Sequence, residues 1–450
     1  MNFMKRDYLF LFLIILFQST LLINYTIKDD SAYGWDQSWH LMITEHKLNQ
    51  IKGVDISTYE VEQKYPIFEF INNYYPPFFH VASLPFYAVS KSLDSALLVN
   101  IFFMAILVVS CYFISKKKIY LSIAVAFFPL YNVLMRQFLI DYALVSLIAL
   151  AYWFLLYSKN FKDTKYSILF AFAFAIGMLT KWSFFVYLLI PTSISILKSK
   201  KIKNLILSGS IILLLISPWY ISKWNIGLLF RNVMISMNSP LFYFGELLTN
   251  LNIVLFLLLI PAIFEIKKSY NLIFLITIFS IIPNKDSRYI APLYLFALSL
   301  ILNKFKRYQK HILIFLIVFS FAFNSSCINL DLGSKNVKMI NTKGYYPKYN
   351  TMDFTILNDV IRENNTICII AEHDSINDAF LPYYVYSNNL PVKKIIGNGC
   401  NPLSYDLSIV GPIKDTWRKK QFMSSYNFLQ ENMDSFEILF EGNFSIYKRR

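Results

Sequence analysis

A carboxylate and an imidazole open the first polar stretch of the chain, where Asp36 precedes His40 by four residues in Gly-Trp-Asp-Gln-Ser-Trp-His. Residues at this spacing share one face of a helix, so the two side chains are able to act on one ligand or to hold one metal ion. The alternative is a solvated loop, in which Asp29 and Asp30 are equivalent to Asp36.

A second carboxylate stands at the beginning of an apolar run, in Arg-Gln-Phe-Leu-Ile-Asp (136–141). An acid at membrane depth is costly unless it faces a cavity or a partner, so Asp141 is a second candidate catalytic residue. Arg136 is a candidate for binding an anionic substrate. The alternative is a structural ion pair between Arg136 and Asp141.

Cations and a tyrosine occupy two short polar turns between apolar segments. Lys181 lies in the first turn, and Lys285, Arg288 and Tyr289 lie in the second. Isolated cations at this level need an anionic partner, and a phosphate group suits them because the planar arginine fork binds two oxygens at once. We therefore assign these residues to substrate binding. The alternative for Arg288 is an ion pair with Asp286, or an extended side chain that reaches the membrane interface.

The composition shows which kind of structure must position these side chains. Of the 450 residues, 56% are hydrophobic, 18% are aromatic and only 16% are charged, and the mean hydropathy is +0.44. Soluble domains average about 45–50% apolar and about 25% charged residues. These values exclude a soluble multidomain enzyme, a disordered chain and a disulfide-rich secreted module, and they predict an α-helical polytopic membrane protein.

Eleven apolar segments approach or exceed the roughly 20 residues that a helix needs to cross a bilayer. We predict about 11 transmembrane helices at residues 8–26, 94–115, 119–135, 138–158, 165–180, 182–197, 203–222, 246–266, 270–283, 288–303 and 311–328. The first is expected to be an uncleaved span, since it is too long for a signal-peptide core and lacks a cleavage site. The shorter segments flank the two polar turns, and such spans end below the surface where a turn lies in a water-filled vestibule.

Basic residues mark one side of the predicted membrane. With the N-terminus in the cytoplasm, the inner segments carry eighteen Lys and Arg residues against three acidic ones, and this excess equals the formal net charge of +15. Positive charge favours the cytoplasmic side. We therefore expect no nucleic-acid partner, and all of the candidate residues fall on the outer face. The richness in Lys, Ile and Asn is typical of a low-GC microbe, which favours the plasma membrane as the location.

Two regions lie outside the predicted spans, both on the outer side. The first is a large outer loop at 27–93 within a transmembrane domain at 1–328, and its residues 36–52 are expected to form an amphipathic helix along the membrane interface. The second is a small extracytoplasmic α/β domain at 329–450.

The C-terminal domain is predicted from short β-rich runs. We expect its elements to be strands at 366–371 and 406–411, a helix at 417–432 and a terminal hairpin at 436–447. Cys368 and Cys400 fall in this domain, and they are equally compatible with a disulfide and with two free thiols.

The order of the polar motifs along the chain resembles a known family. The motifs are Asp36 in the first outer loop, Tyr75-Pro76-Pro77, Asp141 at the start of the fourth span, Leu179-Thr180-Lys181, Pro218-Trp219-Tyr220 near the end of the seventh span, and Arg288-Tyr289-x-x-Pro292 at the start of a late span. This order resembles the GT-C superfamily of polytopic glycosyltransferases, especially the relatives of protein O-mannosyltransferases and lipid A aminoarabinose transferases. The resemblance covers about residues 1–300. Asp36 and His40 also resemble the Asp-Glu-x-x-His motif of the eukaryotic α-1,2-glucosyltransferase that uses dolichyl-phosphate-glucose.

The resemblance implies transfer of a sugar from a polyprenyl-phosphate donor to a glycan, lipid or protein acceptor on the outer face, with inversion. It implies that Asp36 is the general base, and that Lys181 and Arg288 hold the carrier phosphate and stabilise the charge on the leaving group. Two features depart from the family: Gln37 stands where many relatives have a glutamate, and no Asp-x-Asp motif occurs. We therefore expect no cofactor, with a divalent metal held by Asp36 and His40 as the alternative.

Two other classes share part of this pattern. A polysaccharide polymerase or ligase has the same topology and outer cations, but it centres on a large outer loop in the second half of the chain, whereas the large loop here follows the first span. A transporter of lipid-linked glycans places charges near the midplane of several spans, and the predicted spans are nearly free of charge. The expected partners are therefore a polyprenyl-phosphate sugar donor, its acceptor and membrane lipids.

Overall fold

The computed structural model describes residues 2–29, 35–53, 75–222, 241–282, 286–324, 333–334, 337–338, 356–361, 365–372, 381, 383–384, 392–397, 400–413, 419–442 and 444–450. The chain forms two compact units. The helical unit comprises Met1–Thr26, Tyr75–Phe79 and Leu97–Tyr346, and the mixed unit comprises Ile27–Tyr74, His80–Ala96 and Pro347–Arg450. The first outer loop is therefore grouped with the C-terminal region. The predicted division at residue 328 instead assigned that loop to the transmembrane domain. That division stays a prediction.

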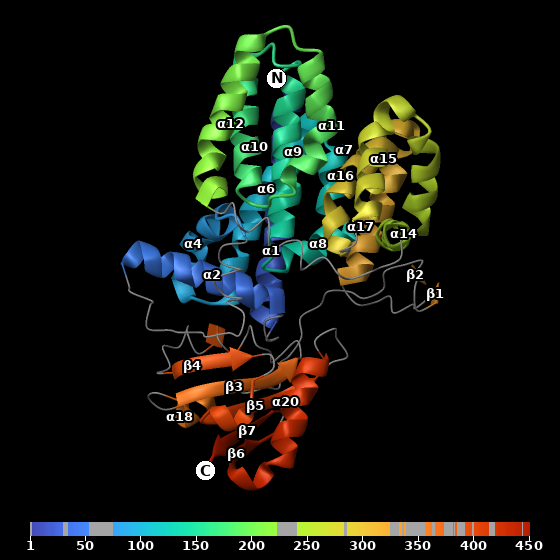
Figure 1. Ribbon diagram of the computed structural model, residues 1–450. Helices are drawn as coiled ribbons and strands as arrows, with labels where there is room; N and C mark the ends of the chain where they lie inside the picture. The colour runs from blue at the N-terminus through green and yellow to red at the C-terminus, as the bar shows by residue number, and fades with distance from the viewer. Residues whose placement is uncertain are drawn as a thin grey trace. The chain divides into compact units, whose positions relative to one another are not determined.

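The helical unit consists of apolar helices that pack side by side (Figure 1). Its helices are α1 (Asn2–Lys28), α6 (Val99–Ile114), α7 (Tyr120–Ala126), α8 (Pro129–Met135), α9 (Ile140–Tyr157), α10 (Thr164–Met178), α11 (Phe184–Leu197), α12 (Ile202–Ser222), α14 (Phe242–Ile263), α15 (Ile266–Ile281), α16 (Ala291–Lys304) and α17 (Gln309–Asn324). α9 packs against α6, α10, α11 and α16, and all of its residues from Ile140 to Ala149 are buried. A helix that is apolar and buried on every side forms the centre of a core, so α9 is the central helix of this unit.

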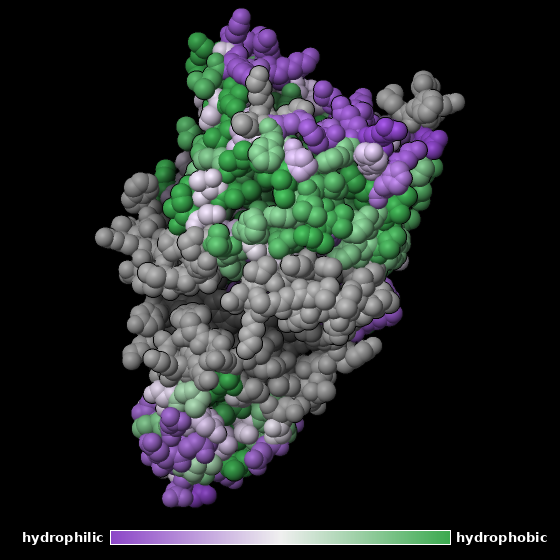
Figure 2. All heavy atoms as spheres, turned by 90° about the vertical axis from the view of Figure 1, so that its right-hand side faces the viewer, coloured by the Kyte–Doolittle hydropathy of each residue, from purple (hydrophilic) through white to green (hydrophobic). Residues whose placement is uncertain are grey.

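Five helical segments of the described residues are long and apolar enough to cross a membrane. They are Arg6–Lys28, Leu93–Ile114, Ile140–Tyr157, Ile202–Ser222 and Phe242–Ile263. Hydrophobic residues cover a broad belt of the helical unit, and hydrophilic residues gather at one end of it (Figure 2). These observations confirm a mostly helical, multi-pass membrane protein. Each of the eleven predicted segments contains helical residues, but the number of spans stays a prediction.

The segment predicted as one span at 119–135 is two short helices. α7 ends at Ala126, and α8 begins at Pro129 after an extended Phe128 (φ −77°, ψ 120°). Proline has no N–H to donate and disfavours a helical conformation of the residue before it, so the helix is interrupted at this point. The prediction of one continuous helix is wrong here, and Pro129 is the signal that it overlooked.

α14 turns sharply at Asn252 (φ 55°, ψ 168°), in a backbone region that few side chains adopt. The Oδ1 atom of Asn252 accepts hydrogen bonds from the N–H groups of Val254 and Leu255 at 3.1 and 3.3 Å. These bonds replace the backbone carbonyl partners that the two N–H groups lose at the break. The rings of Phe244 and Phe256 consequently meet at 5.3 Å between centroids, although twelve residues of straight helix extend about 18 Å.

The mixed unit contains α2 (Trp35–Lys52), most of α4 (Phe78–Ser90) and the start of α5 (Leu93–Leu97). The predicted helix at 36–52 is confirmed by α2. The amphipathic character predicted for this helix is not confirmed, because eight consecutive residues from Ser38 to Glu45 are buried, including polar ones. The location of this helix along the membrane interface stays a prediction.

The C-terminal region forms a five-stranded sheet in the order β4-β3-β5-β7-β6. Its elements are α18 (Ile356–Val360), β3 (Asn365–Glu372), β4 (Val392–Gly397), β5 (Leu407–Ile413), α20 (Lys419–Glu431), β6 (Phe436–Glu441) and β7 (Ser445–Arg449). β3 pairs in parallel with β4 and β5, and β7 pairs antiparallel with β5 and β6. Both predicted strands, the helix and the hairpin are confirmed, whereas β4 was not predicted. A separate two-stranded ladder, β1 (Gly333–Ser334) with β2 (Val337–Lys338), belongs to the helical unit.

A buried disulfide joins Cys368 on β3 to Cys400, which follows β4, with a Cα–Cα distance of 5.8 Å. The structure thus decides between the two alternatives that the sequence left open for these cysteines. Disulfides persist in oxidising compartments and are rare in the cytosol.

Side chains of the first outer loop and of the C-terminal region meet within the mixed unit. The hydroxyl of Tyr383 donates to the backbone oxygen of Lys91 at 3.0 Å and lies 3.4 Å from the hydroxyl of Tyr87. The Nζ atom of Lys91 pairs with the Glu45 carboxylate of α2 at 2.9 Å. The C-terminal region therefore contacts the segment that carries Asp36 through a short chain of polar contacts.

Candidate functional site

A buried ion pair joins two of the predicted motifs. Asp141 lies in the first turn of α9, and its Oδ1 is 2.7 Å from the Nζ atom of Lys181. The two side chains are only 4% and 11% exposed. Asp141 therefore has Lys181 as its partner rather than Arg136, the partner that the structural alternative proposed.

Gly177 allows the turn that carries Lys181 to fold tightly. A Cβ atom at this position would lie 2.2 Å from the ring of Phe184, which is completely buried. The backbone N–H of Lys181 donates to the oxygen of Gly177 at 3.0 Å, and the N–H of Phe184 donates to the oxygen of Lys181 at 3.0 Å. The missing side chain thus lets Phe184 pack on the end of α10, which holds Lys181 in place over Asp141.

Tyr289 connects the second polar turn to this pair. The Nζ atom of Lys181 lies 4.9 Å from the centre of the Tyr289 ring, which is a cation–π contact. The backbone oxygen of Tyr289 accepts a hydrogen bond of 2.6 Å from the hydroxyl of Tyr187 on α11. Three motifs that lie far apart in the sequence therefore converge on one end of the helical unit.

A second ion pair, between Asp286 and Arg288, lies in the turn before α16. Arg288 Nη2 donates to Oδ2 of Asp286 at 2.6 Å, and Arg288 Nε lies 3.1 and 3.0 Å from the two carboxylate oxygens. The side chains are 28% and 26% exposed. Burial raises the pKa of the Asp286 carboxyl, but the hydrogen bonds and charge of Arg288, together with the charge of Lys181, hold that pKa below its usual value.

The Tyr-Pro-Pro segment is tied to the Lys181 turn by a backbone hydrogen bond. The N–H of Phe78, directly after Pro77, donates to the oxygen of Leu179 at 2.8 Å. Proline cannot continue a helix from the residues before it, and α4 begins directly after Pro77, at Phe78. The segment is therefore a support for the Lys181 turn in the helical unit.

Arg136 lies at the end of α8, is buried, and places its guanidinium 5.2 Å from the centre of the Tyr25 ring of α1. This stacking uses the face of the guanidinium. The assignment of Arg136 to substrate binding stays a prediction. Lys285 lies outside the described residues.

Asp36 and His40 both lie on α2, in the mixed unit. Asp36 is half-buried in the first turn. His40 is buried, its Nδ1 is 3.0 Å from Nε2 of His80, and the two rings stack at 5.2 Å. Across the described segments, no group of three or more His, Cys, Asp or Glu side chains is placed to hold a metal ion. The joint action of Asp36 and His40 on one ligand stays a prediction.

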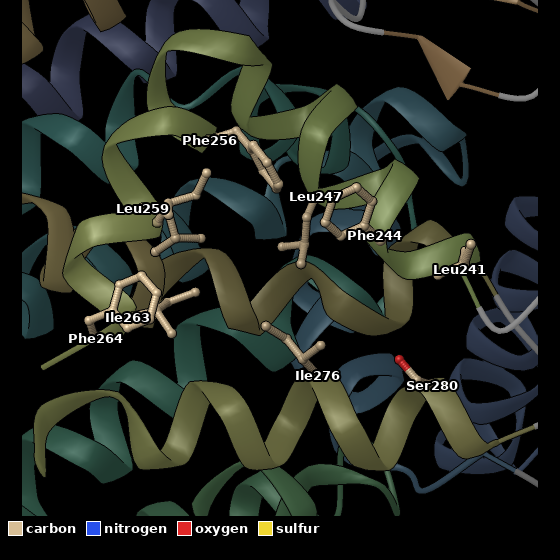
Figure 3. A pocket seen from close by; sticks show the side chains of 10 residues that line it. Leu241, Phe244, Leu247, Phe256, Leu259, Ile263, Phe264, Ile276 and Ser280 are labelled. Carbon is tan, nitrogen blue, oxygen red and sulfur yellow. The ribbon is translucent and has the colours of Figure 1, made fainter. Parts of the chain in front are cut away.

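An apolar groove of about 390 Å³ lies between the two halves of α14 and α15. Figure 3 shows Leu241 and Ser280 at one end of it, and Ile263 and Phe264 at the other. Phe244 and Phe256 line the middle. The break at Asn252 creates this groove because it turns the two halves of α14 toward each other.

Several residues of the site were not predicted. Tyr187 is one of 31 tyrosines, and nothing in the local sequence separates it from core residues. His80 is one of only five histidines, but nothing in its local sequence connects it to His40. Gly177 had a usable signal, since glycine is scarce in this chain, with 12 in total. Asp286 was weighed only as the structural partner of Arg288, and the structure shows that pair.

The chain was compared with known families and structures. The family model for dolichyl-phosphate-mannose-protein mannosyltransferase matches residues 76–222. A comparison with curated protein sequences gives no significant match. The fold is similar to two crystal structures of ArnT from Cupriavidus metallidurans, in the apo state (TM-score 0.65, 12% identity) and bound to undecaprenyl phosphate (TM-score 0.64, 11% identity), each over 97% of both chains.

These two similarities are independent. The family match falls on the segment that carries Pro76-Pro77, Asp141, Lys181 and all of α12. The structural match extends over the whole chain, including the C-terminal region. Taken together, the comparisons show that residues 76–222 match this mannosyltransferase family and that the chain has a fold similar to that of ArnT.

Proposed function

We propose that the protein transfers a sugar from a polyprenyl-phosphate donor to an acceptor hydroxyl on the outer face of the plasma membrane. The acceptor is a glycan, a lipid or a protein. The observation that carries the proposal is a pair of cations: Lys181 contacts the ring of Tyr289, and Arg288, the residue before Tyr289, pairs with Asp286, whose pKa the charge of Lys181 also lowers. One of the similar ArnT structures is bound to undecaprenyl phosphate, which supports a lipid phosphate as the anion.

The two cations have the chemistry that a phosphate leaving group requires. Arg288 presents a planar fork that is partly exposed and able to bind two oxygens. Lys181 is a fixed point charge, because Asp141, Tyr289 and the tight turn hold it. Preorganised positive charge stabilises the negative charge that grows on the phosphate as the bond to the sugar breaks.

The apolar groove beside α14 supports a lipid carrier. Phe244, which lines the middle of the groove, is adjacent in sequence to Tyr243, whose hydroxyl accepts a hydrogen bond of 3.3 Å from the N–H of Asp286. The groove therefore runs close to the turn that carries Arg288, and its walls are apolar along its length. A hydrocarbon chain that leaves a phosphate at Arg288 finds an apolar surface there.

Asp36 is proposed as the general base. It accepts the proton of the acceptor hydroxyl while the hydroxyl oxygen attacks the anomeric carbon, and the bond between that carbon and the phosphate oxygen breaks with inversion. Asp141 is the less suitable of the two acids, because its carboxylate is held by Lys181 in a buried pair. In this proposal Asp141 orients Lys181.

The outer-face orientation is supported by two features of different origin. One is the excess of basic residues in the predicted inner segments, among which Lys116, Lys117 and Lys118 are exposed. The other is the disulfide between Cys368 and Cys400, which requires an oxidising compartment. A cytoplasmic N-terminus and an extracytoplasmic C-terminal region satisfy both.

The experiment that tests the function uses the purified protein in liposomes that contain a polyprenyl-phosphate sugar, and measures release of polyprenyl phosphate on addition of acceptor extracts. Asp36→Asn keeps the size of the side chain and removes its capacity to accept a proton. We expect its turnover to fall by about 10²–10⁴, the typical contribution of a general base, while binding of undecaprenyl phosphate survives.

The control is Asp141→Asn, compared at equal amounts of folded protein. If Asp36→Asn transfers sugar at the normal rate and Asp141→Asn does not, the base is Asp141. His40→Ala separates the remaining roles, because it costs less than Asp36→Asn if His40 only orients α2. It costs about as much, and a chelator inhibits too, if the two side chains hold a metal.

A further inference from the structure

The fork of Arg288 is already occupied by a carboxylate of the same chain. Its Nε and Nη2 atoms lie 2.6–3.1 Å from the two oxygens of Asp286, in the arrangement with which arginine binds a phosphate. The Nε–Nη2 edge of the guanidinium cannot hold both groups in this way at once. Asp286 therefore has to leave before a lipid phosphate takes its place on that edge.

The surroundings of Asp286 allow this exchange. Both side chains of the pair are about one quarter exposed, unlike those of Asp141 and Lys181. The Asp286 carboxylate also accepts a hydrogen bond of 2.8 Å from the backbone N–H of Arg288, which anchors it at the start of a short 3₁₀ turn. The carboxylate is thus tethered within reach of the fork whether or not the fork is occupied.

We propose that Asp286 is an internal competitor for the lipid phosphate, and that it promotes release of the product. This inference rests on the proposed function, in which Arg288 binds the carrier phosphate. The donor is a phosphodiester with one negative charge. The product, polyprenyl phosphate, is a monoester that carries almost two charges at pH 7. The product consequently binds the cations more strongly than the donor does, and a tethered carboxylate that returns to Arg288 opposes this.

The test is the affinity of the full-length protein for undecaprenyl phosphate in detergent micelles. Asp286→Asn keeps the hydrogen bond to the backbone of Arg288 and removes the competing charge. If the carboxylate occupies the fork nine-tenths of the time, its removal raises the apparent affinity about tenfold. Inhibition of sugar transfer by added undecaprenyl phosphate should become stronger by the same factor. Asp286→Ser, which also caps a helical turn, repeats the test if the asparagine variant is unstable.

The matched control is Glu265→Gln, which removes the carboxylate of a partly exposed ion pair with Lys304 (3.0 Å) on another loop. It should leave the affinity unchanged. Equal or weaker binding by Asp286→Asn, with weaker binding by Arg288→Ala, overturns the competitor and retains the phosphate site. Unchanged binding in both variants shows instead that the phosphate does not bind at Arg288, and overturns both.

Discussion

Two ion pairs of the helical unit, Asp141 with Lys181 and Asp286 with Arg288, differ in burial and in how they are held. The pair of Asp141 and Lys181 joins α9 to the turn after α10 and is almost completely inaccessible. The pair of Asp286 and Arg288 joins residues two positions apart in one turn and is partly open to solvent. Both contain one cation of the proposed phosphate site.

The difference shows how one site combines a fixed charge with an exchangeable one. A buried cation whose partner is removed is left uncompensated in a medium of low polarity. Opening a partly exposed ion pair costs little free energy, because water solvates each charge in place of its partner. The account therefore assigns Lys181 a permanent electrostatic role and Arg288 the role of capturing and releasing the anion.

The largest effect is expected for Asp141→Asn, which leaves Lys181 buried without its counter-charge. The loss should be about 3 kcal/mol in the free energy of unfolding, at the lower end of values for broken buried pairs because asparagine still accepts a hydrogen bond. Thermal or denaturant unfolding in detergent measures it. The double variant Asp141→Asn/Lys181→Met should recover much of the loss, and a double variant as unstable as the single one would contradict the charge argument.

Gly177→Ala is expected to have the next largest effect on stability. The new methyl group would overlap the Phe184 ring, and overpacking of a buried site costs about 1–3 kcal/mol. Because Lys181 lies between these two residues, binding of undecaprenyl phosphate should weaken as well. Gly209→Ala on α12 is the control, since a Cβ atom there meets nothing within 4 Å. Equal stability of the two variants would show that the turn is not tightly packed.

Arg288→Ala should change stability least, by less than about 1 kcal/mol, because its partner remains accessible to water. Its binding of undecaprenyl phosphate should nevertheless weaken by about 10- to 100-fold, which corresponds to the loss of a charge-assisted hydrogen bond of about 1.5–3 kcal/mol. A titration of the lipid phosphate against both variant and parent measures this. If Arg288→Ala binds undecaprenyl phosphate normally but is much less stable than the parent, Arg288 has a structural role and does not capture the anion.

Removal of the disulfide tests the orientation rather than the pairs. Cys368→Ser with Cys400→Ser opens a loop of 32 residues, and the loss expected for a loop of this length is about 3 kcal/mol in the C-terminal region alone. Reductant should destabilise the parent protein and leave the double variant unchanged. If Cys368 and Cys400 are free thiols in the parent protein in whole cells, the C-terminal region is not extracytoplasmic.

Much of the fold was accessible from the sequence because it depends on local patterns. Apolar length predicted the helices, and short runs rich in β-forming residues predicted β3, β5 and the terminal hairpin. β4 was missed because Val-Lys-Lys-Ile-Ile-Gly contains two adjacent lysines, which interrupt its apolar run. The burial of α2 was missed because it depends on residues distant in the sequence, which no helical pattern of its own reveals.

The sequence predicted which residues belong to the site but not which of them pair with each other. Asp141, Lys181, Arg288 and Tyr289 were all singled out, since charged and aromatic residues at the ends of apolar segments are conspicuous. The pairing of Asp141 with Lys181 spans 40 residues, and it depends on the packing of α9 against α10 and on the space beside Gly177. Only the structure distinguishes this pairing from the one with Arg136.

A structure of the protein with undecaprenyl phosphate bound tests the central claim most directly. The account predicts phosphate oxygens about 2.7–3.2 Å from the guanidinium nitrogens of Arg288, the Asp286 carboxylate turned away from that fork, and the pair of Asp141 and Lys181 intact. A phosphate bound elsewhere, with Asp286 still on Arg288, would contradict it.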